Sequence, residues 1–420
     1  MKTGTPFTFI DLCAGCGGLS LGLMAAGWEG LFAAEKDPLA FSTLKHNLVN
    51  NGSGWFKWPA WLPKEPTSIE NLLTKYDAHL ERMQGKVRLL AGGPPCQGFS
   101  SIGRRLAHDP RNQVFKHYLK LVELLKPPAV LMENVRGILH PFTKSNSKTD
   151  NQADKPPIYA DLIKSSLADL DYEVWPAIIH AKDYGVPQTR PRFILIGVRR
   201  AGRKTLAALK PFTMMENLRA GFLRKRGLGT DPVTVKEAIS DLCISAGRIE
   251  DCKDTRGYKQ GTYGKQVSPY QQLLHGEENG GPADSHRFAK HLDSTVTKFK
   301  WLIANCHKGK RLEQDERGEY ANKKHYVYIL HPSQPAPTVT TLPDDLLHYS
   351  EPRILTVREM ARLQSFPDWF AFKGKYTTGG DLRTKQCPRY TQVGNAVPPL
   401  LAELLGQTLI DFLNEVDNAK

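Results

Sequence analysis

GGPPCQGFS, residues 92–100, follows a mostly apolar run at 87–91 that predicts the end of a buried strand. Two glycines let the backbone turn sharply, and two prolines fix φ and remove two backbone donors just before Cys96. Reactive cysteines occupy accessible sites, whereas structural cysteines are buried and inert. The stretch therefore predicts a reactive Cys96 on a rigid elbow, followed by a flexible basic loop at 97–112.

Strand and helix patterns alternate on both sides of this elbow, from residue 8 to residue 198. Short apolar strands are predicted at 8–12, 31–35, 130–132 and 193–198. Alternation of this kind is typical of a parallel sheet with helices on both faces. We therefore predict an α/β, doubly wound, Rossmann-like domain.

The first predicted strand runs into a glycine turn at 13–18, which opens a helix as nucleotide-binding loops do. Glu35 ends the next strand, at the distance after Gly15 that suits an acid binding a ribose diol. Ser20 stands where the dinucleotide fingerprint needs glycine, so the pattern fits an adenosine ligand without requiring NAD. Cys13 and Cys16 have no partner pair of cysteines at zinc spacing, so we expect no metal site.

Composition sets the cellular context and the class of partner. The 420 residues carry a formal net charge of +14, and nine Lys/Arg against one acid gather at 199–228, which predicts a phosphate-binding surface. Seven cysteines argue against a disulfide framework and favour a reducing compartment. We find no stretch apolar enough for a signal peptide or a membrane span, so we expect a cytoplasmic protein without a membrane partner.

Four further motifs stand in a fixed order along the chain. They are Glu133-Asn134-Val135 after a strand, Gln188-Thr-Arg190-Pro-Arg192 before another, the helix of 357–366 behind a Thr356 capping box, and Gln392-Val-Gly-Asn395. Together with the glycine turn and the Cys96 elbow, this set resembles the DNA cytosine-5 methyltransferases over nearly the whole chain, apart from a variable middle. The resemblance implies a Rossmann-like methyltransferase domain and a second, smaller, mostly irregular DNA-recognition domain.

The resemblance also implies the cofactor and the roles of the site residues. It implies Cys96 as the nucleophile, Glu133 as the acid that holds the cytosine, and Arg190 and Arg192 as supports of the flipped base. It implies S-adenosylmethionine as cofactor, bound by Asp11, Cys13, Gly15, Gly17, Gly18, Glu35, Lys36, Pro94 and Asn395.

The chain departs from the family pattern at three places on the cofactor side. Cys13 stands where the family usually has phenylalanine, and Lys36 where it often has an aromatic residue. The third family motif offers an aspartate to adenine, but the nearest candidate here, 67–69, reads Thr-Ser-Ile. These departures bear on the adenine contacts and leave the chemistry at cytosine as expected.

The chemistry asks for these residue types independently of the family. Cytosine C5 is a weak nucleophile, and a thiolate that adds at C6 converts the ring to a reactive enamine. Glu133 should be protonated or share a proton at N3 when the base is bound, and an arginine can fix O2. The target atoms are stacked in a duplex, so the nucleotide must be flipped out.

We assign residues 1–198, completed by 386–420, to the catalytic domain and 199–385 to target recognition. Double-stranded DNA is the expected partner of a monomer, and the sequence leaves open a cognate restriction endonuclease and the target site. A tRNA cytosine-5 methyltransferase is the nearest alternative, but its Cys-Phe-Thr tripeptide is replaced by Pro-Phe-Thr at 141–143 and 211–213. A catalytically idle DNA-binding regulator is the alternative from another class.

Overall fold

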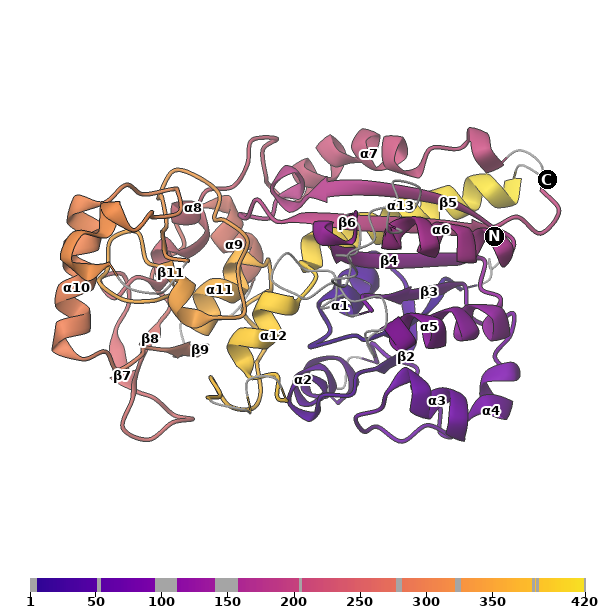
Figure 1. The fold of residues 1–420 in the computed structure, drawn as a ribbon, viewed down its shortest axis with the longest axis horizontal. Helices are drawn as coiled ribbons and strands as arrows, with labels where there is room; N and C mark the ends of the chain where they lie inside the picture. Colours follow the sequence, from indigo (N-terminus) through magenta and orange to yellow (C-terminus); the bar gives the residue numbers. More distant parts are fainter. Residues whose placement is uncertain are drawn as a thin grey trace, which may run out of the picture.

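The computed structural model describes residues 6–50, 54–94, 112–139, 158–203, 206–276, 282–321, 326–379, 382 and 385–418. Cys96 and nearly all of the basic loop predicted at 97–112 lie outside these residues. The described chain forms a first lobe, built on the largest sheet, and a second lobe, with the C-terminal segment passing between them (Figure 1).

A six-stranded sheet of order β2-β1-β3-β4-β6-β5 forms the centre of the first lobe. Its strands are β1 (Thr8–Leu12), β2 (Glu29–Ala34), β3 (Leu89–Gly92), β4 (Ala129–Val135), β5 (Tyr172–His180) and β6 (Pro191–Arg199). The first four pair in parallel, and the predicted doubly wound α/β fold is confirmed.

The prediction of a parallel sheet is wrong at β6, which runs antiparallel to both β4 and β5. The connection from β5 to β6 at 181–190 holds only the 3₁₀ helix η3 (Ala181–Tyr184). A parallel pair needs a crossover of about a dozen residues or more, usually a helix, so this short connection returns the chain antiparallel.

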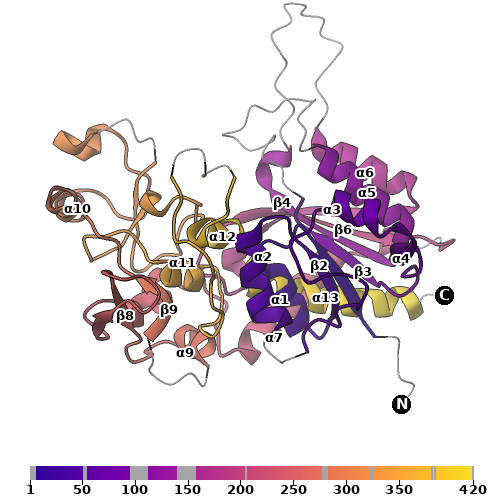
Figure 2. The ribbon, with the colours of Figure 1, turned by 90° about the horizontal axis from the view of Figure 1, so that it is seen from below.

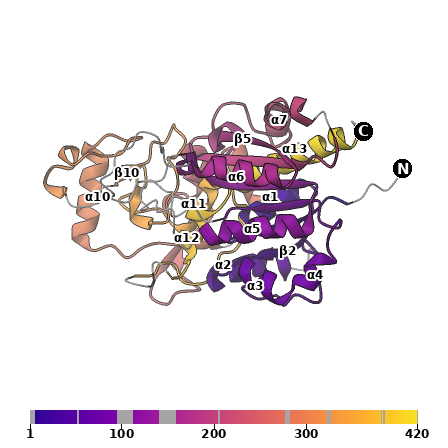
Figure 3. The same cartoon turned by 45° about the vertical axis from the view of Figure 1, so that its right-hand side comes forward.

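Helices cover both faces of the sheet (Figures 2 and 3). Strand residues alternate between the two cores, with Phe9 in the core on one face and Ile10 in the core on the other. The first core is covered by α1 (Gly18–Ala25), α7 (Pro211–Lys225) and α13 (Pro399–Asn418). The second is covered by α3 (Ile69–Lys75), α4 (Asp77–Glu81), α5 (Asn112–Leu125) and α6 (Tyr159–Asp169).

The C-terminal helix α13 is a core element of the first lobe. The segment Arg389–Asn418, which contains this helix, is by length and composition apolar enough to span a membrane, contrary to the expectation from the sequence, but 78% of its apolar window is buried inside the fold. Close packing on α1 explains this burial, because a Cβ at Gly22 would lie 2.4 Å from the Cβ of Ala402. Trp28 Nε1 donates to the carbonyl oxygen of Gly406 at 2.9 Å, and this bond helps to fix the position of the helix along its axis.

The second lobe contains more regular structure than its weak periodicity predicts. It holds a three-stranded sheet, two short paired strands and several helices around α11, whose predicted Thr356–Glu359 capping box is present. The strands are β7 (Ile249–Asp251), β8 (Lys259–Thr262), β9 (Pro282–Arg287), β10 (Tyr328–Ile329) and β11 (Leu346–Leu347). The helices are α8 (Val235–Ile239), α9 (Pro269–His275), α10 (Asp293–Asn305) and α11 (Val357–Leu363). The chain then returns through α12 (Arg389–Asn395), which lies between the two lobes (Figure 1).

Single-turn helices connect these elements in both lobes. They are the 3₁₀ helices η2 (Arg136–Leu139), η4 (Leu206–Ala208), η5 (Ser240–Leu242), η6 (Asp315–Tyr320) and η7 (Pro343–Asp345). The helix α2 (Pro38–Leu44) differs from the others, because it continues directly into a π-helix, η1 (Lys45–Val49).

The basic cluster at 199–228 lies on the first lobe, because its helix α7 packs along α13 (Figure 1). Arg226 pairs with Glu403 of α13 and stacks 3.5 Å over the ring of Phe222. Other members are also used inside the fold, in the pairs Arg200–Glu173 and Arg203–Asp417. Arg224 and Lys225 are exposed, so they are the residues of this helix that remain candidates for the predicted phosphate-binding surface. The domain boundary at 199 stays a prediction.

Candidate active site

The carboxyl ends of four parallel strands meet at one edge of the sheet. Leu12 pairs with both Ala34 and Gly92, and Gly92 pairs with Met132. The segments that follow these strands therefore lie side by side, at the edge where doubly wound folds bind their ligands. They are the glycine turn at 13–18, Glu35, Gly93-Pro94 and Glu133-Asn134.

The glycine turn has the backbone geometry that its composition predicts. Gly15 and Gly17 have positive φ angles of 57° and 97°, and Cys13 shares this region with a φ of 56°. A Cβ at Gly17 would lie 2.8 Å from Leu48, and one at Gly18 would lie 2.4 Å from the carbonyl oxygen of Val397. A Cβ at Gly15 would meet nothing within 4 Å, so open space adjoins the turn there.

Glu35 is held against this turn. Its Oε2 accepts from the backbone N–H of Gly15 at 2.9 Å, and its Oε1 accepts from the N–H of Asp37 at 2.7 Å. Burial raises the pKa of the Glu35 carboxyl. The Thr67 N–H donates to the Glu35 carbonyl oxygen at 2.8 Å, so the segment that replaces the family's third motif also reaches this position.

Asp11 is the residue that points most clearly to a bound ligand with a hydrogen-bond donor. Its side chain is fully buried, and Oδ2 accepts from the Ser20 hydroxyl at 2.6 Å. Its Oδ1 has no hydrogen-bond partner among the described residues, and burial raises the pKa of Asp11 to about 7. Buried polar atoms are nearly always hydrogen-bonded, so this oxygen fits a polar group of a bound ligand.

Glu133 and Arg192 form an ion pair beside the start of the elbow at Gly93-Pro94. Arg192 Nε lies 2.8 Å from Glu133 Oε1, and the side chains are only 8% and 12% exposed. The antiparallel pairing of β4 with β6 brings the two residues together, because it places Arg192 opposite Val135. A Cβ at Gly93 would lie 3.2 Å from Glu133 Oε2, so the absence of a side chain at Gly93 leaves room for this carboxylate.

Asn134 ties the start of the elbow to the same strand. Its Nδ2 donates to the carbonyl oxygen of Pro94 at 3.0 Å, and both residues are buried. The chain therefore leaves the sheet next to Glu133 two residues before Cys96.

Arg190 is held by backbone carbonyls. It is buried, and its guanidinium donates to Val339 O at 3.2 Å and to Gly394 O at 2.8 Å. Of the two predicted arginines, Arg192 is therefore the one placed against the carboxylate, while Arg190 links three segments of the chain. Lys36 and Asn395, predicted on the cofactor side, are exposed.

Sequence reasoning missed the glutamine network that joins these motifs. The buried Gln188 side chain donates to Leu363 O at 3.0 Å and accepts from the N–H of Val339 at 2.8 Å. Gln364 continues the network, donating to Val393 O at 2.7 Å. These bonds end mainly on backbone atoms, so no residue pattern identifies the partner segment at 336–341.

A doubly wound sheet with an adenosine-type turn and a Glu–Arg pair at one edge defines a Rossmann-like methyltransferase. The chain belongs to the C-5 cytosine-specific DNA methylase family, whose model matches residues 7–411. It is a DNA (cytosine-5-)-methyltransferase, an enzyme of DNA methylation.

Named relatives match nearly the whole length of the chain. The type II methyltransferase M.DdeI of Desulfomicrobium norvegicum is 30% identical over 97% of this chain and 89% of its own. M.XorII of Xanthomonas oryzae is 30% identical over 97% of this chain and 85% of its own. A crystal structure described as a prophage-encoded DNA modification methyltransferase (E. coli) matches with a TM-score of 0.61 and 25% identity, over 97% and 99% of the two chains.

Proposed function

We propose that this enzyme transfers a methyl group from S-adenosylmethionine to C5 of a flipped-out cytosine in a specific double-stranded DNA sequence. The transfer passes through a covalent bond between Cys96 and C6 of the base. The Glu133–Arg192 pair, held 2.8 Å apart beside the elbow that carries Cys96, is the observation that supports this function most directly. Glu133 shares a proton with N3 of the cytosine, and Arg192 donates a hydrogen bond to its O2 oxygen.

The described residues fit the cofactor. The orphaned oxygen of Asp11 suits its amino group, Glu35 suits its ribose diol, and the open space at Gly15 leaves room beside them. We assign Gly17, Gly18, Cys13 and Pro94 to the same cofactor side, together with Lys36 and Asn395, which are exposed. The cofactor supplies an electrophilic methyl group when bound.

Each proposed step at the base is assigned to a residue of this chain. Cys96 adds to C6, and the charge that develops on the ring is met by a proton held between Glu133 and N3. The Arg192 guanidinium, fixed by its carboxylate partner, donates to O2. The activated C5 would take up the methyl group as the bond from that group to the donor sulfur breaks, which leaves a neutral thioether. The C5 proton would then pass to solvent and the C6–Sγ bond would break, so that the Cys96 thiolate leaves the methylated base.

Expression in a host without cytosine methylation tests this function. We expect bisulfite sequencing of host DNA to show one fully methylated sequence motif, and no motif with the Cys96→Ser variant. Methylation confined to tRNA would identify the RNA-modifying alternative. Sequence-specific DNA binding without methylation would identify the idle regulator.

We further propose a monomer in the cytoplasm, with residues 1–198 and 386–420 catalytic and 199–385 concerned with target recognition. The named relatives are type II methyltransferases, which supports a restriction endonuclease of the same specificity as a functional partner.

The Glu35→Ala variant should bind S-adenosylmethionine more weakly by roughly 1–3 kcal/mol, because hydrogen bonds to a charged group are lost. The ionised carboxylate is the acceptor, and burial raises the pKa of Glu35, so affinity should also fall as the pH drops through that raised value. Isothermal titration calorimetry measures both effects. Glu29→Ala, at the other end of β2, is the matched control, and equal affinities for the two variants would remove Glu35 from the site.

A further inference from the structure

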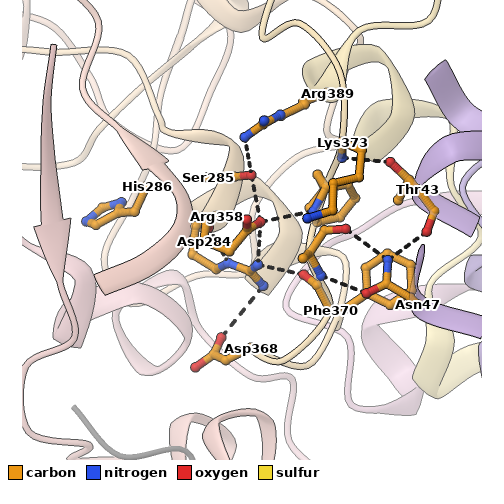
Figure 4. A network of polar contacts seen from close by, with 12 residues as sticks. Thr43, Asn47, Asp284, Ser285, His286, Arg358, Asp368, Phe370, Lys373 and Arg389 are labelled. Atoms are coloured by element: carbon orange, nitrogen blue, oxygen red, sulfur yellow. Dashed lines mark hydrogen bonds and ion pairs between the residues drawn. The ribbon is translucent and has the colours of Figure 1, made fainter. Parts of the chain in front are cut away.

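The helix α2 and its π-helical end η1 hydrogen-bond the backbone of a segment, residues 371–373, by which the chain leaves the second lobe after α11 (Figure 4). Asn47 Nδ2 donates to Ala371 O at 2.8 Å, and the Ala371 N–H donates back to Asn47 Oδ1 at 2.9 Å. One turn earlier, Thr43 Oγ1 accepts from the N–H of Lys373 at 2.8 Å and donates to Gln392 Oε1 at 2.7 Å. Both side chains are buried, so the first lobe fixes this backbone at two points.

The second lobe holds the opposite side of the same segment. The Phe372 N–H donates to Asp284 Oδ2 at 3.0 Å, and Arg358 donates to Phe370 O at 2.7 Å. Arg358 also donates to Asp284 Oδ2 at 3.2 Å, which joins α11 to β9 (Figure 4). The backbone groups of Phe370 and Phe372 therefore bond to the second lobe, and those of Ala371 and Lys373 bond to the first.

The packing around this segment does not set its register. Phe370 packs at a tilt and Phe372 packs edge-on against Phe366, with ring centroids 4.8 Å and 5.3 Å away. Apolar burial is non-directional, whereas hydrogen bonds weaken steeply when distance or angle changes. The bonds from Thr43 and Asn47 are thus the contacts that fix where the segment sits along α2.

The same helix begins at Pro38, shortly after Glu35, the acid predicted to bind the cofactor. Asp37 follows Glu35 closely, caps α2 with Oδ1, and accepts from the Cys387 N–H with Oδ2 at 3.0 Å. Cys387 lies on the segment by which the chain returns from the second lobe to α12. Both attachments to α2 therefore lie on the one connection between α11 and α12, by which the chain leaves the second lobe.

We propose that Thr43 and Asn47 are positioning residues that set the register of the DNA-recognition lobe against the catalytic lobe, and so determine sequence fidelity. This inference rests on the proposed function, in which the second lobe reads the bases around the flipped cytosine. A small slide of the segment along α2 would move the reading side chains relative to the base pairs, while the catalytic residues on the sheet stay in place.

Thr43→Val tests the proposal, because it keeps the shape of the side chain and leaves the Lys373 N–H and Gln392 Oε1 without partners. We expect the ratio of kcat/KM between the target duplex and duplexes with one altered base pair to fall about tenfold. The loss should come from a higher KM for target DNA, with unchanged affinity for S-adenosylmethionine. Thr43→Ser, which keeps the hydroxyl, should restore discrimination.

Thr408→Val is the matched control, since Thr408 is equally buried but bonds only within α13, to Leu404 O at 2.8 Å. Discrimination by Thr43→Val equal to that of wild type or of Thr408→Val would overturn the proposal, as would failure of Thr43→Ser to restore it. If Thr43→Val does not fold, Asn47→Ser carries the same expectation. A wild-type enzyme that methylates no DNA would refute the proposed function instead, before any variant is compared.

Discussion

Replacement of Cys96 by serine is expected to lower methyl transfer by roughly 10⁴-fold or more, the scale seen when a nucleophile is removed. It should also abolish a covalent complex that the wild-type enzyme forms with target DNA containing 5-fluorocytosine. A cysteine adduct at C6 is released only after the C5 proton is lost, and fluorine cannot leave in that way. Intact-mass spectrometry should show the complex with wild type, and only when the methyl donor is present.

Other thiols of the chain provide the control for this experiment. Burial raises the pKa of Cys16 to about 12, and it raises that of Cys13 as well, so both are protonated near neutral pH. Cys16→Ser should therefore still form the complex. DNA binding should survive in Cys96→Ser, because affinity depends mainly on phosphate contacts. An adduct that persists in Cys96→Ser, or one missing in wild type at a verified target, would rule out Cys96 as the nucleophile.

Sequence patterns brought several candidate site residues together because strand ends in a doubly wound sheet meet at one edge. The spacing of Gly15 and Glu35 predicted a shared site, and their 2.9 Å hydrogen bond confirms that they adjoin. The resemblance assigned Glu133 and Cys96 to the same base, and in the structure Asn134, next to Glu133, bonds to Pro94. Such predictions succeed because they depend on local periodicity and on chain direction.

The helices and strands of the second lobe could not be predicted from the sequence in this way, and the reason is physical. Part of its interior is built from buried ions, such as Arg362 with Asp241 and Asp368, and Arg353 with Glu359. Charged residues inside a core remove the apolar periodicity that predicts helices and strands. Arg362 pairs both with Asp368, six residues further on, and with Asp241, 121 residues away, so the sequence gives no signal of which charges pair.

The two arginines of Gln188-Thr-Arg190-Pro-Arg192 show the same limit within the site. Successive side chains of an extended strand face opposite sides and residues two apart share a side, so Arg190 and Arg192 could both be expected beside the base. The fold uses Arg190 to hold carbonyl groups of Val339 and Gly394, contributed by segments far away in the chain. Only the antiparallel pairing of β6 with β4 shows that Arg192 meets Glu133.

Glu133→Gln should lower the rate of methyl transfer by roughly 10³-fold, within the range for loss of a general acid or base. Glutamine keeps the volume and can donate a hydrogen bond to N3, but it cannot carry the proton or balance Arg192. The nearly buried guanidinium then loses its charge partner, which should loosen its hold on O2 of the base. Single-turnover kinetics on a duplex of the identified target measure the loss, and cofactor calorimetry should show unchanged binding.

Glu173→Gln is the matched control, because Glu173 also pairs with an arginine, Arg200, at 2.9 Å, but on a more exposed surface. Exposed pairs contribute about 0–1 kcal/mol, so this variant should methylate at the wild-type rate. Arg192→Gln should resemble Glu133→Gln, and the double variant should lose far less than the product of the two single losses, since the residues act as a unit. Multiplicative losses would show that the two residues act separately, and near-normal turnover by Glu133→Gln would exclude Glu133 as the acid at N3.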